Sequence, residues 1–337
     1  CLTQAGAFAT QLTAARCEVV EFHKRKGNDF RLPTRIAASA RQHRLDILHA
    51  RGWPALVETA LAARLARVRR TVYGFHGKTM ADLQGWGLKR RLLQRLAIRW
   101  YDHAVTLNPL MQMDFAAESG LSASRIRVIA NGVDIDTFYP RDAKAALRAE
   151  FGIPQDRFVI GNVARLDPVK NHEVILRTIA RLRSQEGGTP YFVLVGEGPH
   201  RAVLEHEVEQ LGLKGDVQFL GYSQRIPELL NCMDLYIQSS FYEGFSNTII
   251  EAMACELPLL ATHVGGTADV FPPSLEGIYF RPNDEETLAV LILQMRQDSC
   301  LSARVARQMR RHVVEHFSVH MMVRRYEALY LELMEKN

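Results

Sequence analysis

The 337 residues of this chain are enough for two domains of ordinary size, and its 47% of apolar residues is typical of a globular protein. Its apolar runs fall short of the ~18 residues that cross a bilayer, and we expect no signal peptide, which argues against a membrane-spanning or secreted protein. Five cysteines without paired spacing predict reduced thiols in a cytoplasmic protein and argue against a disulfide framework or a zinc site.

Positive charge is concentrated in the first part of the chain. Residues 1–140 contain 21 Lys and Arg against 11 Asp and Glu, a net charge of +10, whereas residues 141–337 carry a net charge of −5. The densest stretch, Arg64 to Arg99, has ten basic residues and one acidic residue. This bias favours an anionic partner (a membrane surface, a phospholipid-linked acceptor or a nucleic acid), although a charge run is more often a solvated helix face.

In the first half of the chain, short apolar segments alternate with helical patterns. Strands are predicted at Glu18–Phe22, Asp46–His49, Thr71–Phe75, His103–Leu107 and Arg125–Ile129. Helices are predicted at residues 33–44, 54–67 and 88–101. In the last of these helices, Leu88, Leu92, Leu93 and Leu96 stand between basic residues. This helix therefore either lies at an anionic membrane surface or buries its leucines in the domain.

The second half alternates strand and helix more regularly. The predicted strands are Phe158–Val163, Tyr191–Val195, Val217–Leu220, Asp234–Gln238 and Leu257–Ala261. Helices are expected to begin near Asn171, Ile226 and Ser246, and a long last helix is expected at Phe317–Leu333. Apolar strands separated by helices predict parallel sheets covered on both faces, so the fold class is α/β, with two units joined near residues 140–156.

Polar loops follow three of these strands. Residues 161–171 carry Arg165 and Lys170, a planar fork and a point charge that suit a diphosphate. Residues 239–248 contain Glu243 and lead into a helix with Glu251; carboxylates can bind sugar hydroxyls, and free N–H groups at a helix start favour phosphate. Residues 262–267 include two glycines that allow close backbone approach. Parallel sheets bind ligands beyond these strand ends, although each loop alone also fits an ordinary surface turn.

One histidine of the first half is in a comparable place. His76 directly follows the predicted strand Thr71–Phe75. A histidine at a strand end either faces a ligand or is structural, and the second is more common for a lone histidine.

Five motifs together resemble the retaining glycosyltransferases of family 4, which have the GT-B fold. They are NGVDIDTFYP, GNVARLDPVKNHEVIL, VGEGPHR, FLGY and SSFYEGFSNTIIEAMACELPLLATHVGG, and the resemblance is strong over about residues 128–266. More narrowly, YGFHGKTMADLQGWGLKRRLLQRL is similar to sugar transferases of bacterial exopolysaccharide gene clusters. The resemblance implies two Rossmann-like domains facing each other across a cleft. Residues 1–150 would bind the acceptor, residues 151–316 the nucleotide sugar, and residues 317–337 would cross back to the first domain.

The resemblance also implies roles for single residues. Arg165 and Lys170 would neutralise the donor diphosphate, with no metal ion or other cofactor. Glu251 would bind the ribose, Glu243 would bind the transferred sugar as a catalytic residue, and His76 would line the reaction centre as a second catalytic residue. The remaining implied residues are Phe245, Ser246, Asn247 and Thr248 at the diphosphate and sugar, and Gly196, Glu197, Leu220 and Gly221 near the nucleobase.

These features predict a retaining hexosyltransferase (EC 2.4) that is cytoplasmic or peripheral on the inner membrane leaflet. It would move a sugar from a nucleotide diphosphate to a polysaccharide or lipid-linked acceptor in exopolysaccharide or lipopolysaccharide synthesis. No second carboxylate is placed as an obvious nucleophile, which favours direct attack over a covalent intermediate. The alternatives are a nucleotide-sugar epimerase of similar fold and a basic nucleic-acid-binding protein; no recognised nucleic-acid module supports the latter, so no nucleic-acid partner is expected.

The start of the chain departs from the family pattern. Residues 4–15 already predict the helix that follows the family's first strand and Gly-rich loop. We therefore expect that strand and loop to be missing, and transfer by this chain to be weak.

Overall fold

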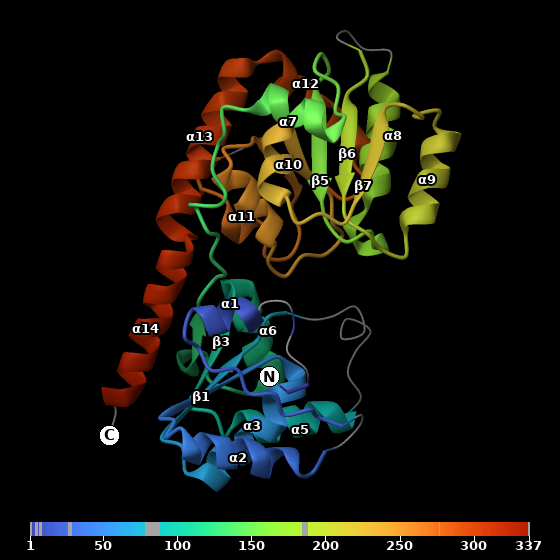
Figure 1. Cartoon of the computed structure of the whole chain (residues 1–337). Helices are drawn as coiled ribbons and strands as arrows, with labels where there is room; N and C mark the ends of the chain where they lie inside the picture. Colours follow the sequence, from blue (N-terminus) through green and yellow to red (C-terminus); the bar gives the residue numbers. More distant parts are fainter. Residues whose placement is uncertain are drawn as a thin grey trace. The chain divides into compact units, whose positions relative to one another are not determined.

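The computed structural model describes residues 2–3, 6, 9–25, 29–77, 88–183, 188–275 and 277–335, without the side chains of residues 11 and 88–91. The described chain forms two compact units, each built on a parallel sheet (Figure 1). One unit comprises the residues up to Ile129 together with those from Arg325 onward, and the other runs from Ala130 to Arg324.

The first unit contains a sheet of four parallel strands in the order β1-β2-β3-β4. These strands are β1 Ile47–Arg51, β2 Arg70–Gly74, β3 His103–Thr106 and β4 Ile126–Val128. The helices are α1 Ala9–Ala14, α2 Leu32–Gln42, α3 Trp53–Ala66, α5 Leu88–Ile98 and α6 Pro109–Ser119. Four of the five predicted strands of this half are confirmed, and so are the helices predicted at residues 33–44, 54–67 and 88–101. Helix α1 lies within the helix expected at residues 4–15.

The predicted strand Glu18–Phe22 is wrong. This segment lies outside the sheet of the described residues. The two residues that follow it bond to residues 2 and 3: His23 N–H donates to Thr3 O at 3.2 Å, and Lys24 N–H donates to Leu2 O at 2.7 Å. Val19, Val20 and Phe22 favour a strand by their β propensity, but propensity alone does not decide whether a segment joins a sheet.

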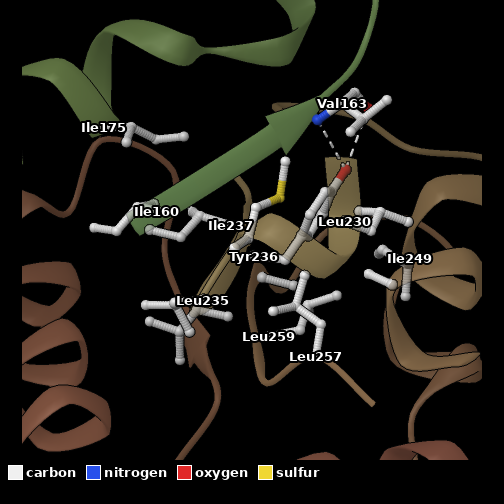
Figure 2. Packing of buried hydrophobic residues seen from close by; sticks show 14 of the residues in the cluster. Ile160, Val163, Ile175, Leu230, Leu235, Tyr236, Ile237, Ile249, Leu257 and Leu259 are labelled. Atoms are coloured by element: carbon white, nitrogen blue, oxygen red, sulfur yellow. Dashed lines mark hydrogen bonds between the residues drawn. The ribbon is translucent and has the colours of Figure 1, made fainter. Parts of the chain in front are cut away.

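The second unit contains a six-stranded parallel sheet in the order β10-β9-β8-β5-β6-β7. Its strands are β5 Val159–Val163, β6 Tyr191–Val195, β7 Val217–Gly221, β8 Leu235–Gln238, β9 Leu259–Thr262 and β10 Tyr279–Phe280. Every residue of β5, β6, β8 and β9 is buried, so both faces of this sheet are covered, as the continuous apolar runs predict. Figure 2 shows part of this core, in which Tyr236 of β8 is surrounded by aliphatic side chains.

Helices flank this sheet in two groups. Helix α8 packs on α9 and α12, whereas α10 packs on α7 and α11 packs on α13. Their bounds are α7 Lys144–Phe151, α8 His172–Leu182, α9 Arg201–Gln210, α10 Ile226–Cys232, α11 Asn247–Ala254, α12 Glu285–Gln297, α13 Ser299–His316 and α14 Val319–Glu335. The predicted last helix corresponds to α14, which divides at Arg325 between the two units. No helix among the described residues is both long and apolar enough to span a membrane.

The first unit ends earlier than the expected domain boundary at residue 150. Helix α7 belongs to the second unit because it packs on α10. The guanidinium of Arg148, in α7, donates to Cys232 O at 2.8 Å and to Asp234 Oδ2 at 2.6 Å. A buried arginine with these partners fixes α7 to the second sheet.

Candidate functional site

The order of the second sheet defines where a ligand can bind. The chain runs from β5 outward through β6 to β7, then returns to the other side of β5 and continues through β8 and β9 to β10. The loops that follow the adjacent strands β5 and β8 therefore run in opposite directions, which makes this edge a topological switch point. Parallel α/β sheets bind ligands in the crevice at such a point. The first and second predicted ligand loops are these two loops.

The two switch-point loops contact each other through side chains and backbone. Lys170 Nζ donates to Glu243 Oε2 at 2.7 Å, an ion pair between the loop after β5 and the loop after β8. Phe241 N–H donates to Val169 O at 2.8 Å, and Ser239 Oγ donates to Lys170 O at 2.8 Å. Two predicted ligand-binding residues, 73 positions apart in the chain, are thus brought together.

Arg165 lies in the same loop as Lys170 and is more exposed. Its guanidinium pairs with Asp167, and 69% of the arginine side chain is accessible to solvent. Only 14% of the Asp167 side chain is exposed, but most of Arg165 faces solvent, so another anion can reach the guanidinium beside its carboxylate partner.

Glycines allow the neighbouring loops to pack closely on these two. A Cβ on Gly265 would lie 2.1 Å from Glu243 O, and the backbone of this glycine has φ 51°. Gly266 N–H donates to the same carbonyl at 3.0 Å. A Cβ on Gly196 would lie 1.9 Å from Ala164 O, so the loop after β6 contacts the loop after β5. The third predicted loop therefore supports the backbone of Glu243.

The residues expected near a nucleobase gather at the ends of β6 and β7. Gly196 N–H donates to Gly221 O at 2.8 Å, and Leu166 N–H donates to Glu197 O at 3.0 Å. The side chain of Glu197 is exposed and pairs with Arg201, while Leu220 is half-buried. This group adjoins the first loop, on the side of β5 away from Glu243.

The amino end of α11 follows directly on the second loop. Ser246 is the N-cap residue, with extended backbone and no side-chain cap bond, and its hydroxyl lies 3.1 Å from that of Thr248. Asn247 Oδ1 accepts a hydrogen bond of 3.0 Å from Asn131, and Phe245 packs against another aromatic ring. The first N–H groups of α11 are thus open to an anionic ligand.

Glu251 lies one turn into α11 and is half-buried. Burial raises the pKa of its carboxyl from 4.5 to about 7. Among the described residues, no hydrogen-bond or ion-pair partner of this carboxyl is found. A half-buried carboxyl without a partner can accept hydrogen bonds from a ligand once it is ionised.

His76 belongs to the first unit, where it follows β2 and is exposed. It lies beside a second histidine, because a Cβ on Gly74 would be 3.0 Å from His76 Nε2 and 3.1 Å from His49 Nε2. His49 Nδ1 is bonded to Tyr330 OH at 2.7 Å, and burial, Arg51 and His76 lower the pKa of His49 to about 4. Sequence reasoning missed His49 and Tyr330, which are 281 positions apart.

Two further polar residues of the second unit were missed. His172 is fully buried at the start of α8, its Nε2 lies 3.0 Å from Asn162 Oδ1, and burial lowers its pKa to about 4. Gln238, the last residue of β8, donates to Glu243 Oε2 at 3.1 Å. A buried amide in an apolar strand is the signal that could have identified Gln238.

Comparison with known families assigns both units. The family model described as Glycosyl transferases group 1 matches residues 143–312, and that described as Glycosyltransferase Family 4 matches residues 3–137. Among relatives, "Putative glycosyltransferase EpsF" of Bacillus subtilis (strain 168) is 34% identical over 60% of this chain and 53% of that protein. The "UDP-Gal:alpha-D-GlcNAc-diphosphoundecaprenol alpha-1,3-galactosyltransferase" of Escherichia coli is 24% identical over 87% of this chain and 77% of that protein.

Solved structures agree with these matches. HepE of Anabaena, in complex with UDP and glucose, is similar with a TM-score of 0.83 and 25% identity, over 98% of this chain and 90% of that chain. The expected fold class, α/β with two Rossmann-like domains of the GT-B type, is confirmed.

Proposed function

The chain belongs to the group 1 glycosyl transferases, and we propose that it transfers a sugar from a uridine diphosphate donor to a saccharide or lipid-linked acceptor. The ion pair between Lys170 and Glu243 carries this proposal. The pair brings an ammonium and a carboxylate side by side at the switch point of the sheet, and these groups suit a diphosphate and sugar hydroxyls, which supports the proposal. HepE binds UDP and glucose, which supports the choice of donor.

In this proposal, fixed positive charge drives the reaction. The bond between the anomeric carbon and the diphosphate oxygen breaks, and the diphosphate leaves with the bonding electrons. Lys170, Arg165 and the free N–H groups of α11 stabilise the departing charge in place of a metal ion. Glu251 binds the ribose, and Glu243 binds hydroxyls of the transferred sugar.

The acceptor hydroxyl attacks the same face of the sugar, and its proton passes to the departing diphosphate oxygen. The product then keeps the anomeric configuration of the donor. In this scheme His76, in the first unit, binds the acceptor.

An acceptor carried at a membrane fits the surface of the first unit. Helix α5 exposes 58% of Leu92, 44% of Leu93 and 51% of Leu96, so these leucines are not part of the core. Trp100, just beyond α5, is also exposed, and the guanidinium of Arg64 in α3 lies 4.8 Å from the centre of its ring. Exposed leucines beside arginines suit the interface of an anionic membrane. The basic residues of the first turn of α5 lie outside the described side chains.

Calorimetry and product analysis test the proposal. The chain should bind UDP more tightly than GDP or ADP and should release UDP from UDP-glucose. The anomeric proton coupling of the product, read by NMR, should match that of the α-linked donor. An epimerase would change the sugar without net release of UDP, and a folded chain that neither binds UDP nor releases it would refute the assignment.

A further inference from the structure

Gln238 occupies an unusual place for an amide. It ends β8, a strand that is buried along its whole length, and only 1% of Gln238 is exposed. A buried amide destabilises the fold unless its donors and its acceptor are paired. The hydrogen-bond partners of the Gln238 amide should therefore indicate its role in the protein.

Both N–H groups of the Gln238 amide have acceptors, and its oxygen lies near a hydroxyl. Its Nε2 donates to Ser240 Oγ at 2.7 Å and to Glu243 Oε2 at 3.1 Å, and its Oε1 lies 3.4 Å from Tyr236 OH. The same hydroxyl lies 3.2 Å from Val163 O and 3.4 Å from Val163 N, as Figure 2 shows. Because a hydroxyl has one hydrogen, Tyr236 donates to either Val163 O or Gln238 Oε1. The two donations from Nε2, to Ser240 and Glu243, set which way the amide faces.

Both donors to Glu243 bind the same oxygen. Lys170 Nζ at 2.7 Å and Gln238 Nε2 at 3.1 Å are directed at Oε2. Among the described residues, no hydrogen bond to Oε1 is found. Oε1 is therefore the oxygen that can accept hydrogen bonds from a sugar.

We propose that Gln238 is a positioning residue that keeps Glu243 oriented toward the transferred sugar while Lys170 binds the donor diphosphate. This inference rests on the proposed function. The ammonium of Lys170 has three donors but a single charge, and a diphosphate, which carries more charge than a carboxylate, weakens its pairing with Glu243. Only 11% of the Glu243 side chain is exposed, so its ionised form needs a remaining donor, and Gln238 is a donor that no phosphate can attract.

The test compares two glutamines of the same sheet. Gln238→Leu removes the donor to Glu243. Gln218→Leu is the control, because it removes a comparable amide in β7. Gln218 Oε1 lies 3.2 Å from Tyr191 OH, and its Nε2 donates to Phe151 O at 3.1 Å. For Gln238→Leu we expect kcat for UDP release from UDP-glucose to fall about tenfold to a hundredfold, the effect of losing a hydrogen bond to a charged group. The Kd for UDP should stay within about twofold, because UDP contains no transferred sugar.

The pH profile separates positioning from general destabilisation. Gln238→Glu gives a second variant: its carboxyl, when protonated, donates the same hydrogen bond, so activity should recover only at acid pH. The control variant should keep the parent profile.

Two results would overturn the inference in distinguishable ways. If the parent turns over UDP-glucose and Gln238→Leu has a parent-like kcat, the positioning role alone is excluded. A parent that binds no UDP and releases none would remove the proposed function and this role with it.

Discussion

The affinity for UDP should depend on pH through Glu251. Burial raises the pKa of this carboxyl from 4.5 to about 7, so at pH 5.5 only about 3% of ligand-free molecules carry it ionised, against about 97% at pH 8.5. If the ionised carboxylate binds the ribose, the Kd for UDP should be about thirtyfold larger at pH 5.5 than at pH 8.5 from this residue alone.

Isothermal titration calorimetry of the parent and of Glu251→Gln measures this dependence. The terminal phosphate of UDP also titrates in this range, but it does so equally in both proteins. The ratio of the two Kd values therefore isolates Glu251. The reasoning fails if the parent and the variant show the same change of Kd between pH 5.5 and pH 8.5.

The same pKa makes a prediction about stability. The folded protein retains the Glu251 proton above pH 4.5, where the unfolded chain loses it, so the free energy of unfolding should fall between about pH 4.5 and pH 7. The loss amounts to at most about 3 kcal/mol for a shift of this size. Glu251→Gln should raise the Tm relative to the parent at pH 8 and lose this advantage near pH 4.5. Equal differences at both pH values would contradict a buried, partnerless carboxyl.

The loops and the exposed helix give three more predictions. Arg165→Ala and Lys170→Ala should each weaken UDP binding by about 1–3 kcal/mol in calorimetry, the range for charge-assisted hydrogen bonds; parent-like affinity would exclude that residue from the site. Gly265→Ala should lower the Tm, because the new Cβ would lie 2.1 Å from Glu243 O and because φ of this residue is 51°, which strains any residue with a side chain. An unchanged Tm would be inconsistent with that packing. Substituting Leu92 and Leu96 by Ser should reduce sedimentation with anionic vesicles at low salt and leave UDP affinity unchanged; equal binding of the parent to neutral vesicles would argue against an anionic surface.

The sequence predicts the second sheet well for a physical reason. Strands buried on both faces of a parallel sheet are continuous apolar runs, and such runs are visible without a partner strand. Once the strands are known, the carboxyl ends of neighbours must lie together, so Lys170 and Glu243 are expected at one edge before any distance is measured. Sequence periodicity cannot supply the ion pair itself, because side-chain pairing depends on the three-dimensional path of both loops.

The missed elements fall into two kinds. Helix α6 has local signals, since Asn108 caps it by accepting from Met111 N–H at 2.7 Å and Gly120 ends it with left-handed backbone, so closer attention to capping would have predicted it. Contacts such as that between His49 and Tyr330 have no local signal, because they join strand β1 to the last helix. The false strand at Glu18–Phe22 belongs with the second kind, because β propensity is a local signal, whereas joining a sheet depends on contacts with residues distant in the sequence.

The ion pair between Lys170 and Glu243 also bears on how the site distinguishes donor from product. In the ligand-free protein each charge satisfies the other, so a ligand that draws Lys170 away must leave Glu243 with a new partner or with an unsatisfied oxygen. A nucleotide sugar offers phosphate oxygens to the lysine and hydroxyls to the carboxylate at once. A free nucleoside diphosphate offers only the phosphates, so its binding carries the cost of the broken pair. Under the proposed function, the pair thus favours binding of the donor over retention of the spent nucleotide.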